Sequence, residues 1–239
     1  YKGGSGPPLL ILHEALANPA WTPYHQALAQ KFSVYAPSHP GYDKSERPGW
    51  VSTVTDVAHF YLGMLQNLGL RQVSLMGFSI GGWIAAELAA MCPDRVNGLV
   101  LVGAVGVKPQ AKDIAEVMMV SPEQVKSLAY YDQNKAPDPL ELTADEERVL
   151  WRNREMTSRL CWKPYMHNPK LPEYLKLINI PTLIVWGRQD GIVPSECGEI
   201  YQQVLTGSVL HVIDQCGHSP QIEKPDEFLG VSLKFLSRL

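Results

Sequence analysis

Hydrophobic residues gather in short apolar runs along the chain, and segments of helical pattern separate these runs. Short runs without polar alternation predict strands that are buried on both faces. Strands that alternate with helices indicate a mostly parallel, doubly wound sheet of the α/β class. The predicted strands are residues 9–12, 32–36, 73–76, 96–102, 182–186 and 208–213, and the predicted helices are residues 21–30, 53–68, 81–91, 195–205 and 225 onward.

The alternation stops between about residues 107 and 179, where the pattern predicts helices but no buried strand. This part is also rich in Met, Trp and Tyr, which suits an inserted helical cap over the carboxyl edge of the sheet. The alternative is that these large side chains only pack the small core of the cap itself. The predicted cap helices are residues 111–119, 121–130 and 143–160, and the predicted organisation is a core of residues 1–106 and 180–239 with a cap of residues 107–179.

Composition narrows the classes of function. The chain has 239 residues, of which 45% are hydrophobic, enough for a packed core. Lys and Arg number 21 against 24 Asp and Glu, and no basic run stands out, so nucleic acid and anionic membranes are not expected partners. No apolar stretch is long enough to span a membrane, and a small-molecule substrate is the expected partner.

The four cysteines show neither Cys-x-x-Cys spacing nor the density of a disulfide scaffold. Reduced thiols in a cytoplasmic compartment are therefore expected. The first eight residues lack the apolar core of a signal peptide. A monomer or a homodimer is the expected state of association.

The strongest chemical motif is Gly77-Phe78-Ser79-Ile80-Gly81, which lies between a predicted buried strand and an Ala- and Leu-rich helix. A serine hydroxyl becomes a useful nucleophile when a tight turn pushes it toward a base. Glycines two positions before and after Ser79 leave room where a Cβ would collide with the neighbouring strand and helix. The competing interpretation is a glycine-rich turn with an exposed serine.

Two further residues could complete a catalytic triad. Asp190 and His218 each follow the carboxyl end of a predicted strand, at the edge where open α/β sheets build their sites. Taken alone, Asp190 could be a loop carboxylate and His218 a solvated loop histidine. Taken together with Ser79, in the order Ser, Asp, His, they predict a nucleophile, an orienting acid and a base.

The remaining polar residues indicate no cofactor. We expect His13 and His39 to make structural hydrogen bonds, and the histidines and carboxylates show no metal-ligand spacing. Nucleotide-binding motifs such as Gly-x-Gly-x-x-Gly are absent from the sequence.

With these motifs, the chain resembles the α/β-hydrolase superfamily over essentially its whole length. The resemblance implies that the backbone N–H groups of Ile80 and Ala15 form the oxyanion hole. The family usually carries His-Gly where this sequence has His13-Glu14, and we expect Glu14 to be a structural or rim carboxylate. The family also begins with two further antiparallel strands, and we expect these to be missing from the chain given.

The resemblance implies a serine hydrolase that cleaves a small apolar or aromatic carboxylic ester through an acyl-serine intermediate. Carbon-carbon bond hydrolases of ring-cleavage diketones are an alternative, although they typically carry Asn before the serine and Trp after the histidine, where this chain has Phe78 and Ser219. A cofactor-free perhydrolase and a hydrolase-like small-molecule receptor also stay open. Phe78, Trp162 and Met118 are the expected substrate contacts.

Overall fold

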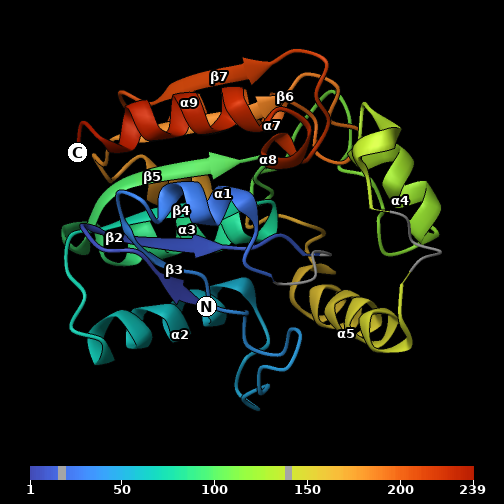
Figure 1. Ribbon diagram of the computed structural model, residues 1–239, viewed down its shortest axis with the longest axis horizontal. Helices are drawn as coiled ribbons and strands as arrows, with labels where there is room; N and C mark the ends of the chain where they lie inside the picture. Colours follow the sequence, from blue (N-terminus) through green and yellow to red (C-terminus); the bar gives the residue numbers. More distant parts are fainter. Residues whose placement is uncertain (16–19, 138–141) are drawn as a thin grey trace.

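The computed structural model describes residues 1–15, 20–137 and 142–239. Its described strands form one seven-stranded sheet in the order β1-β3-β2-β4-β5-β6-β7, in which only the β1–β3 pair is antiparallel (Figure 1). The α/β-hydrolase fold predicted from the sequence is therefore confirmed. The strands are β1 Lys2–Gly3, β2 Pro8–Leu12, β3 Ser33–Tyr35, β4 Val73–Phe78, β5 Val96–Val102, β6 Thr182–Gly187 and β7 Val209–Ile213.

Side chains alternate between two hydrophobic cores, one on each face of the sheet. In β5, Leu99 and Leu101 belong to one core, whereas Val100 and Val102 belong to the other. Because both faces are covered by helices, the strands read as continuous apolar runs in the sequence. The first core packs against α2 Val54–Asn67, α3 Ile80–Met91 and α7 Glu196–Val204, and the second packs against α1 Pro23–Leu28 and α9 Pro225–Leu236.

Residues 107–179 connect β5 to β6, and four of them, residues 138–141, lie outside the described part. Helices α4 and α5 lie beyond the carboxyl ends of the strands (Figure 1). Both begin at capping boxes, in which the side chains of Ser121 and Thr143 accept hydrogen bonds from the backbone N–H three residues later. The described helices here are α4 Pro122–Ala129, α5 Ala144–Cys161 and α6 Leu171–Leu175.

The helix predicted at residues 111–119 is wrong, because this segment forms turns. The backbone N–H of Ala115 donates to the carbonyl of Ile192 at 2.9 Å, which ties the segment to the loop after β6. The sequence did not reveal β1 either, because two residues carry no hydrophobic period. Among the described residues, no helix has the length and apolar character needed to cross a membrane.

Helix α3 packs so closely on β2 that it needs glycine at the contact. A Cβ placed on Gly81 would lie 2.2 Å from the carbonyl oxygen of Leu12. The oxygen at this contact belongs to the backbone, so it could not move aside as a flexible side chain would.

We therefore expect Gly81→Ala to lower the free energy of unfolding by about 1–3 kcal/mol or more. The matched control is Gly63→Ala in α2, where a Cβ would meet nothing within 4 Å and the gain in helix propensity is about 1 kcal/mol or less. Urea unfolding of both variants measures the difference. Equal effects of the two substitutions would contradict the close approach.

Candidate active site

Ser79 occupies a strained turn between β4 and α3. Its backbone has φ 52° and ψ −116°, a combination that residues with a Cβ rarely adopt. The turn is held by backbone hydrogen bonds, since Ser79 N donates to Val102 O at 2.9 Å and Gly82 N donates to Ser79 O at 3.0 Å. A Cβ on Gly77 would lie 2.2 Å from Gly81 O, so both glycines of the motif are required by packing.

Asp190 and His218 meet in the loops after β6 and β7. The Nδ1 of His218 lies 2.7 Å from Oδ2 of Asp190, and both side chains are buried. The other carboxylate oxygen accepts hydrogen bonds from the N–H groups of Ile192 at 2.9 Å and Val193 at 2.8 Å. Because an ionised carboxylate can only accept hydrogen bonds, Nδ1 of His218 carries the proton and Nε2 is left as an acceptor.

The histidine loop is also fixed by a buried glutamate that the sequence analysis missed. Oε1 of Glu223 accepts a hydrogen bond from Gly217 N at 2.7 Å, and Oε2 accepts bonds from Tyr131 N at 2.8 Å and Asp132 N at 2.9 Å. Glu223 thus links the residue before His218 to the chain that follows α4. A glutamate in a short helix gives no sequence signal for this role.

The carboxyl end of α4 contacts the loops that carry Asp190 and His218. The carbonyl oxygen of Ala129 accepts a hydrogen bond from His218 N at 2.6 Å, and that of Leu128 accepts one from Gly191 N at 3.0 Å. The position of α4 is therefore coupled to the positions of Asp190 and His218.

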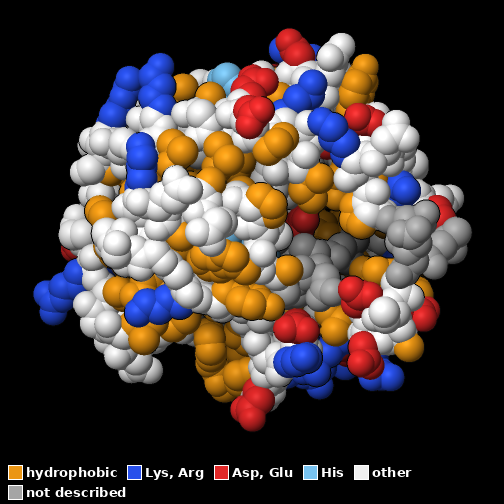
Figure 2. Space-filling model, in the orientation of Figure 1, with side chains coloured by type: hydrophobic (Ala, Val, Ile, Leu, Met, Phe, Trp, Pro, Cys, Tyr) orange, Lys and Arg blue, Asp and Glu red, His pale blue; other side chains and the backbone are white. Residues whose placement is uncertain are grey.

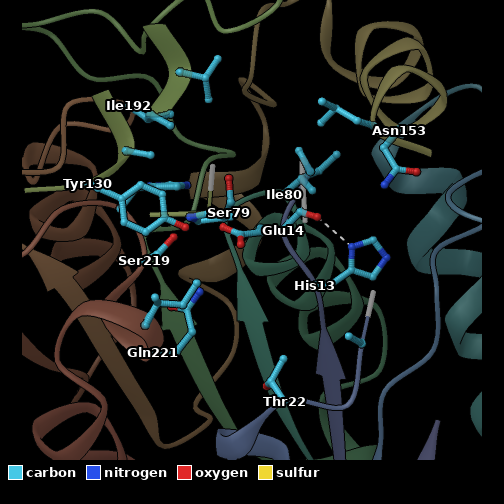
Figure 3. A pocket seen from close by; sticks show the side chains of 18 of the residues that line it. His13, Glu14, Thr22, Ser79, Ile80, Tyr130, Asn153, Ile192, Ser219 and Gln221 are labelled. Atoms are coloured by element: carbon cyan, nitrogen blue, oxygen red, sulfur yellow. Dashed lines mark hydrogen bonds between the residues drawn. The ribbon is translucent and has the colours of Figure 1, made fainter. Parts of the chain in front are cut away.

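Two stacked histidines hold the loop that follows β2. His13 Nε2 accepts a hydrogen bond from His39 N at 3.0 Å, so Nδ1 of His13 donates to Glu14 O at 2.7 Å (Figure 3). His39 Nε2 donates to His13 O at 2.9 Å, which leaves its Nδ1 to accept from the Tyr61 hydroxyl at 2.7 Å. This confirms the structural role expected of the two histidines.

Burial keeps both rings neutral, because it lowers the pKa of His13 to about 4 and that of His39 well below its ordinary value. The backbone around Ala15 is therefore held by a neutral hydrogen-bond network.

A cavity of about 790 Å³ opens at the carboxyl edge of the sheet, in the size range of small-molecule sites. Figure 2 shows the hollow between α4 and α5, with hydrophobic side chains around it. Ser79, Ile80, Ala15 and His218 all line this cavity, and Asp190 lies behind His218. Ile80 is the first residue of α3, where backbone N–H groups have no partner inside the helix.

A comparison with protein families identifies the chain. The model of the alpha/beta hydrolase fold matches residues 7–225. The chain belongs to the alpha/beta hydrolase family.

Named relatives of the hydrolase include the 2-hydroxymuconate semialdehyde hydrolase of Pseudomonas sp. (strain CF600), 28% identical over 99% of this chain and 89% of the relative. The 2-hydroxy-6-oxo-2,4-heptadienoate hydrolase of Pseudomonas putida is 30% identical over 98% of this chain and 90% of the relative. Among solved structures, a bacterial membrane phospholipase A has a TM-score of 0.85 at 27% identity, covering 99% of this chain and 81% of that one. The chain is a hydrolase.

The three residues expected to contact substrate lie outside the described cavity lining. Phe78 points to the opposite face of the sheet, where it packs against Tyr24 and Phe228. Trp162 is 55% exposed on the outer surface, and Met118 packs against the first hydrophobic core. The apolar side chains that line the cavity instead include Ile114, Val117, Val125, Tyr130 and Ile192.

Glu14 lines the cavity beside Ser79, and its side chain reaches toward Ser219 and Tyr130 (Figure 3). Burial raises the pKa of Glu14 above its ordinary value, while the charge of His218 and a hydrogen bond from the Ser219 hydroxyl offset part of this effect. Glu14 thus belongs to the wall of the cavity that Ser79 and His218 also line. Within the described parts of the chain, no cluster of three His, Cys, Asp or Glu side chains could hold a metal ion.

The pKa of His218 depends on the charge of Asp190 beside it. Burial lowers its pKa, but the charge of Asp190, the hydrogen bond to it and the charge of Glu14 more than offset this, so the pKa of His218 lies above 6.5. In Asp190→Asn the burial effect is largely uncompensated, and we expect the pKa to fall below 6.5. An NMR titration, with the resonance assigned by its loss in His218→Gln, measures both values.

The matched control is Glu227→Gln, which removes the carboxylate 2.9 Å from His211 on the surface. It should leave the titration of His218 unchanged. An unchanged pKa in Asp190→Asn would show that Asp190 does not stabilise the imidazolium.

The histidine network gives a stability prediction. Tyr61→Phe removes the hydroxyl that donates to His39 and leaves a buried acceptor without a partner, at an expected cost of about 1–3 kcal/mol in unfolding free energy. The control Tyr174→Phe, at a tyrosine that is 43% exposed, should change the free energy of unfolding by less than about 0.5 kcal/mol. Similar values for the two variants in chemical denaturation would argue against the network.

Proposed function

We propose that the protein hydrolyses small carboxylic esters through an acyl-serine intermediate, in a cavity that suits an apolar or aromatic acyl group. One observation carries the proposal: Ser79 and His218 open into the same, mainly apolar cavity, with Asp190 on the far nitrogen of His218. A nucleophile, a base and an orienting acid are the groups that acyl transfer requires. The segment of residues 107–179 would act as the cap, with Ile114, Val117 and α4 contributing to the cavity wall.

In the proposed first step, Oγ of Ser79 attacks the ester carbonyl and Nε2 of His218 takes the hydroxyl proton. The N–H groups of Ile80 and Ala15 would bind the oxyanion, at the positive end of the dipole of α3. The imidazolium is stabilised by Asp190 and then returns the proton to the leaving alcohol. Water repeats the sequence on the acyl-serine, which releases the acid and restores Ser79.

A second candidate is carbon-carbon bond hydrolysis of a ring-cleavage diketone. It is supported by the relatives of 28% and 30% identity, whose names describe hydrolases of such compounds. The heptadienoate named for one of them is a carboxylate, and in this chain it would enter a cavity that already holds the carboxyl group of Glu14. Like charges in an apolar enclosure repel, so we favour esters that carry no carboxylate over this acid.

Hydrolysis of p-nitrophenyl esters of rising acyl length tests the proposal. We expect turnover of some members, and a loss of at least about 10³-fold in kcat/KM in Ser79→Ala, because the nucleophile is gone. Ser237→Ala, an exposed serine at the end of α9, is the control and should retain the wild-type rates. Ser79-dependent cleavage of 2-hydroxy-6-oxo-2,4-heptadienoate without ester hydrolysis would establish the second candidate instead.

A further inference from the structure

The loop after β2 places a carboxyl side chain where a substrate carbonyl would bind. Glu14 directly precedes Ala15, whose N–H is proposed to bind the oxyanion, and both residues line the cavity. The hydrogen bond from His13 Nδ1 to Glu14 O fixes the backbone from which this side chain starts. A substituent near the scissile carbonyl would therefore lie within reach of the Glu14 carboxyl group.

Glu14 lacks a permanent counter-charge within the described residues. No Lys or Arg of this part forms an ion pair with it, and the groups that favour its charged form are His218, which is not permanently charged, and the neutral hydroxyl of Ser219. Two basic side chains, Lys126 and Arg154, line the cavity from α4 and α5, but Arg154 donates to the carbonyl of Val120 and packs over Trp151. A carboxylate in an apolar cavity is costly unless a cation joins it.

Two tyrosine rings line the cavity around Glu14. They belong to Tyr24 and Tyr130, and Tyr130 lies beside Ser219 near Glu14 (Figure 3). A carboxylate next to aromatic rings suits an ammonium group, because both the charge and the ring faces attract a cation. The same arrangement repels a carboxylate.

We propose that Glu14 is a specificity residue that binds an ammonium group within about two carbons of the scissile carbonyl. The favoured substrates are then amino-acyl esters, that is, esters of small amino acids with a protonated amine. This inference rests on the proposed ester hydrolysis and names its substrate class. When such a substrate binds, its ammonium group supplies the counter-charge that Glu14 lacks.

Three ethyl esters of nearly equal size test the charge preference at pH 7. Ethyl 3-aminopropanoate carries an ammonium group, ethyl butanoate has a methyl group in its place, and monoethyl succinate has a carboxylate. For the wild type we expect kcat/KM at least about 10-fold higher for the cation than for the neutral ester, and lowest for the anion. Measuring the ethanol released gives kcat/KM for each of the three esters.

Glu14→Gln keeps the shape of the side chain and removes its charge. We expect the cation-to-neutral ratio of kcat/KM to fall at least about 10-fold, mainly through KM for the cation, and the anion to become a better substrate relative to the neutral ester. Glu227→Gln, at a surface carboxylate 2.9 Å from His211 and outside the cavity lining, is the control and should leave the ratio unchanged. A wild type without cation preference, or a ratio that Glu14→Gln does not change, overturns the inference while ester hydrolysis stands.

A binding measurement tests the cation site separately from catalysis. If no ester is cleaved, the proposed ester hydrolysis is wrong, but binding still decides whether Glu14 binds an ammonium group. Calorimetry with Ser79→Ala compares benzylammonium, benzyl alcohol and benzoate. We expect benzylammonium to bind most tightly, and at least about 10-fold more weakly once Glu14→Gln is added. Equal affinities with and without Glu14 would overturn the cation site.

Discussion

The close approach of three backbone segments at Ser79 is the constraint on which the rest of the site depends. The turn brings α3 against β2 and β4 so tightly that a Cβ on either motif glycine would lie 2.2 Å from a carbonyl oxygen. Ser79 itself takes a φ of 52°, held by hydrogen bonds to both sides of the turn. The packing of α3 on the sheet thus supports a local strain that presents the serine side chain to the cavity.

Hydrogen bonds join the wall of the cavity to the loops that carry Asp190 and His218. The last carbonyls of α4 accept from His218 N and from Gly191 N, and Glu223 joins the chain after α4 to Gly217. The element that forms part of the cavity wall therefore also fixes the loops of Asp190 and His218. A substrate that displaced α4 would move these two loops as well as change the size of the cavity.

Much of the fold could be predicted from the sequence, because a parallel sheet covered on both faces leaves continuous apolar runs. Asp190 and His218 could be brought together in advance, because the carboxyl ends of parallel strands meet at one edge. The helix expected at residues 111–119 could not be excluded, because the Ala115 hydrogen bond to Ile192 is a tertiary contact. Phe78, the residue before the motif serine, was expected to contact substrate, whereas the alternation of β4 turns it to the opposite face.

Glu14 was expected to be a structural or rim carboxylate, and it lies in the cavity wall. Its surroundings could not be predicted, since they depend on how the loop after β2 is held by His13 and His39. The local chemistry of the cavity, apolar with one carboxyl group near the nucleophile, emerges only when β2, α3 and the loop after β7 are brought together.

Trapping the covalent intermediate is the most direct test of the proposed acyl-serine mechanism. Wild-type protein is mixed with p-nitrophenyl butyrate, quenched in acid during the first turnovers, digested and analysed by mass spectrometry. We expect one butanoyl group on the peptide that contains Ser79, and none in Ser79→Ala. Hydrolysis that proceeds without any acyl group on Ser79, or with the group on another residue, would contradict it.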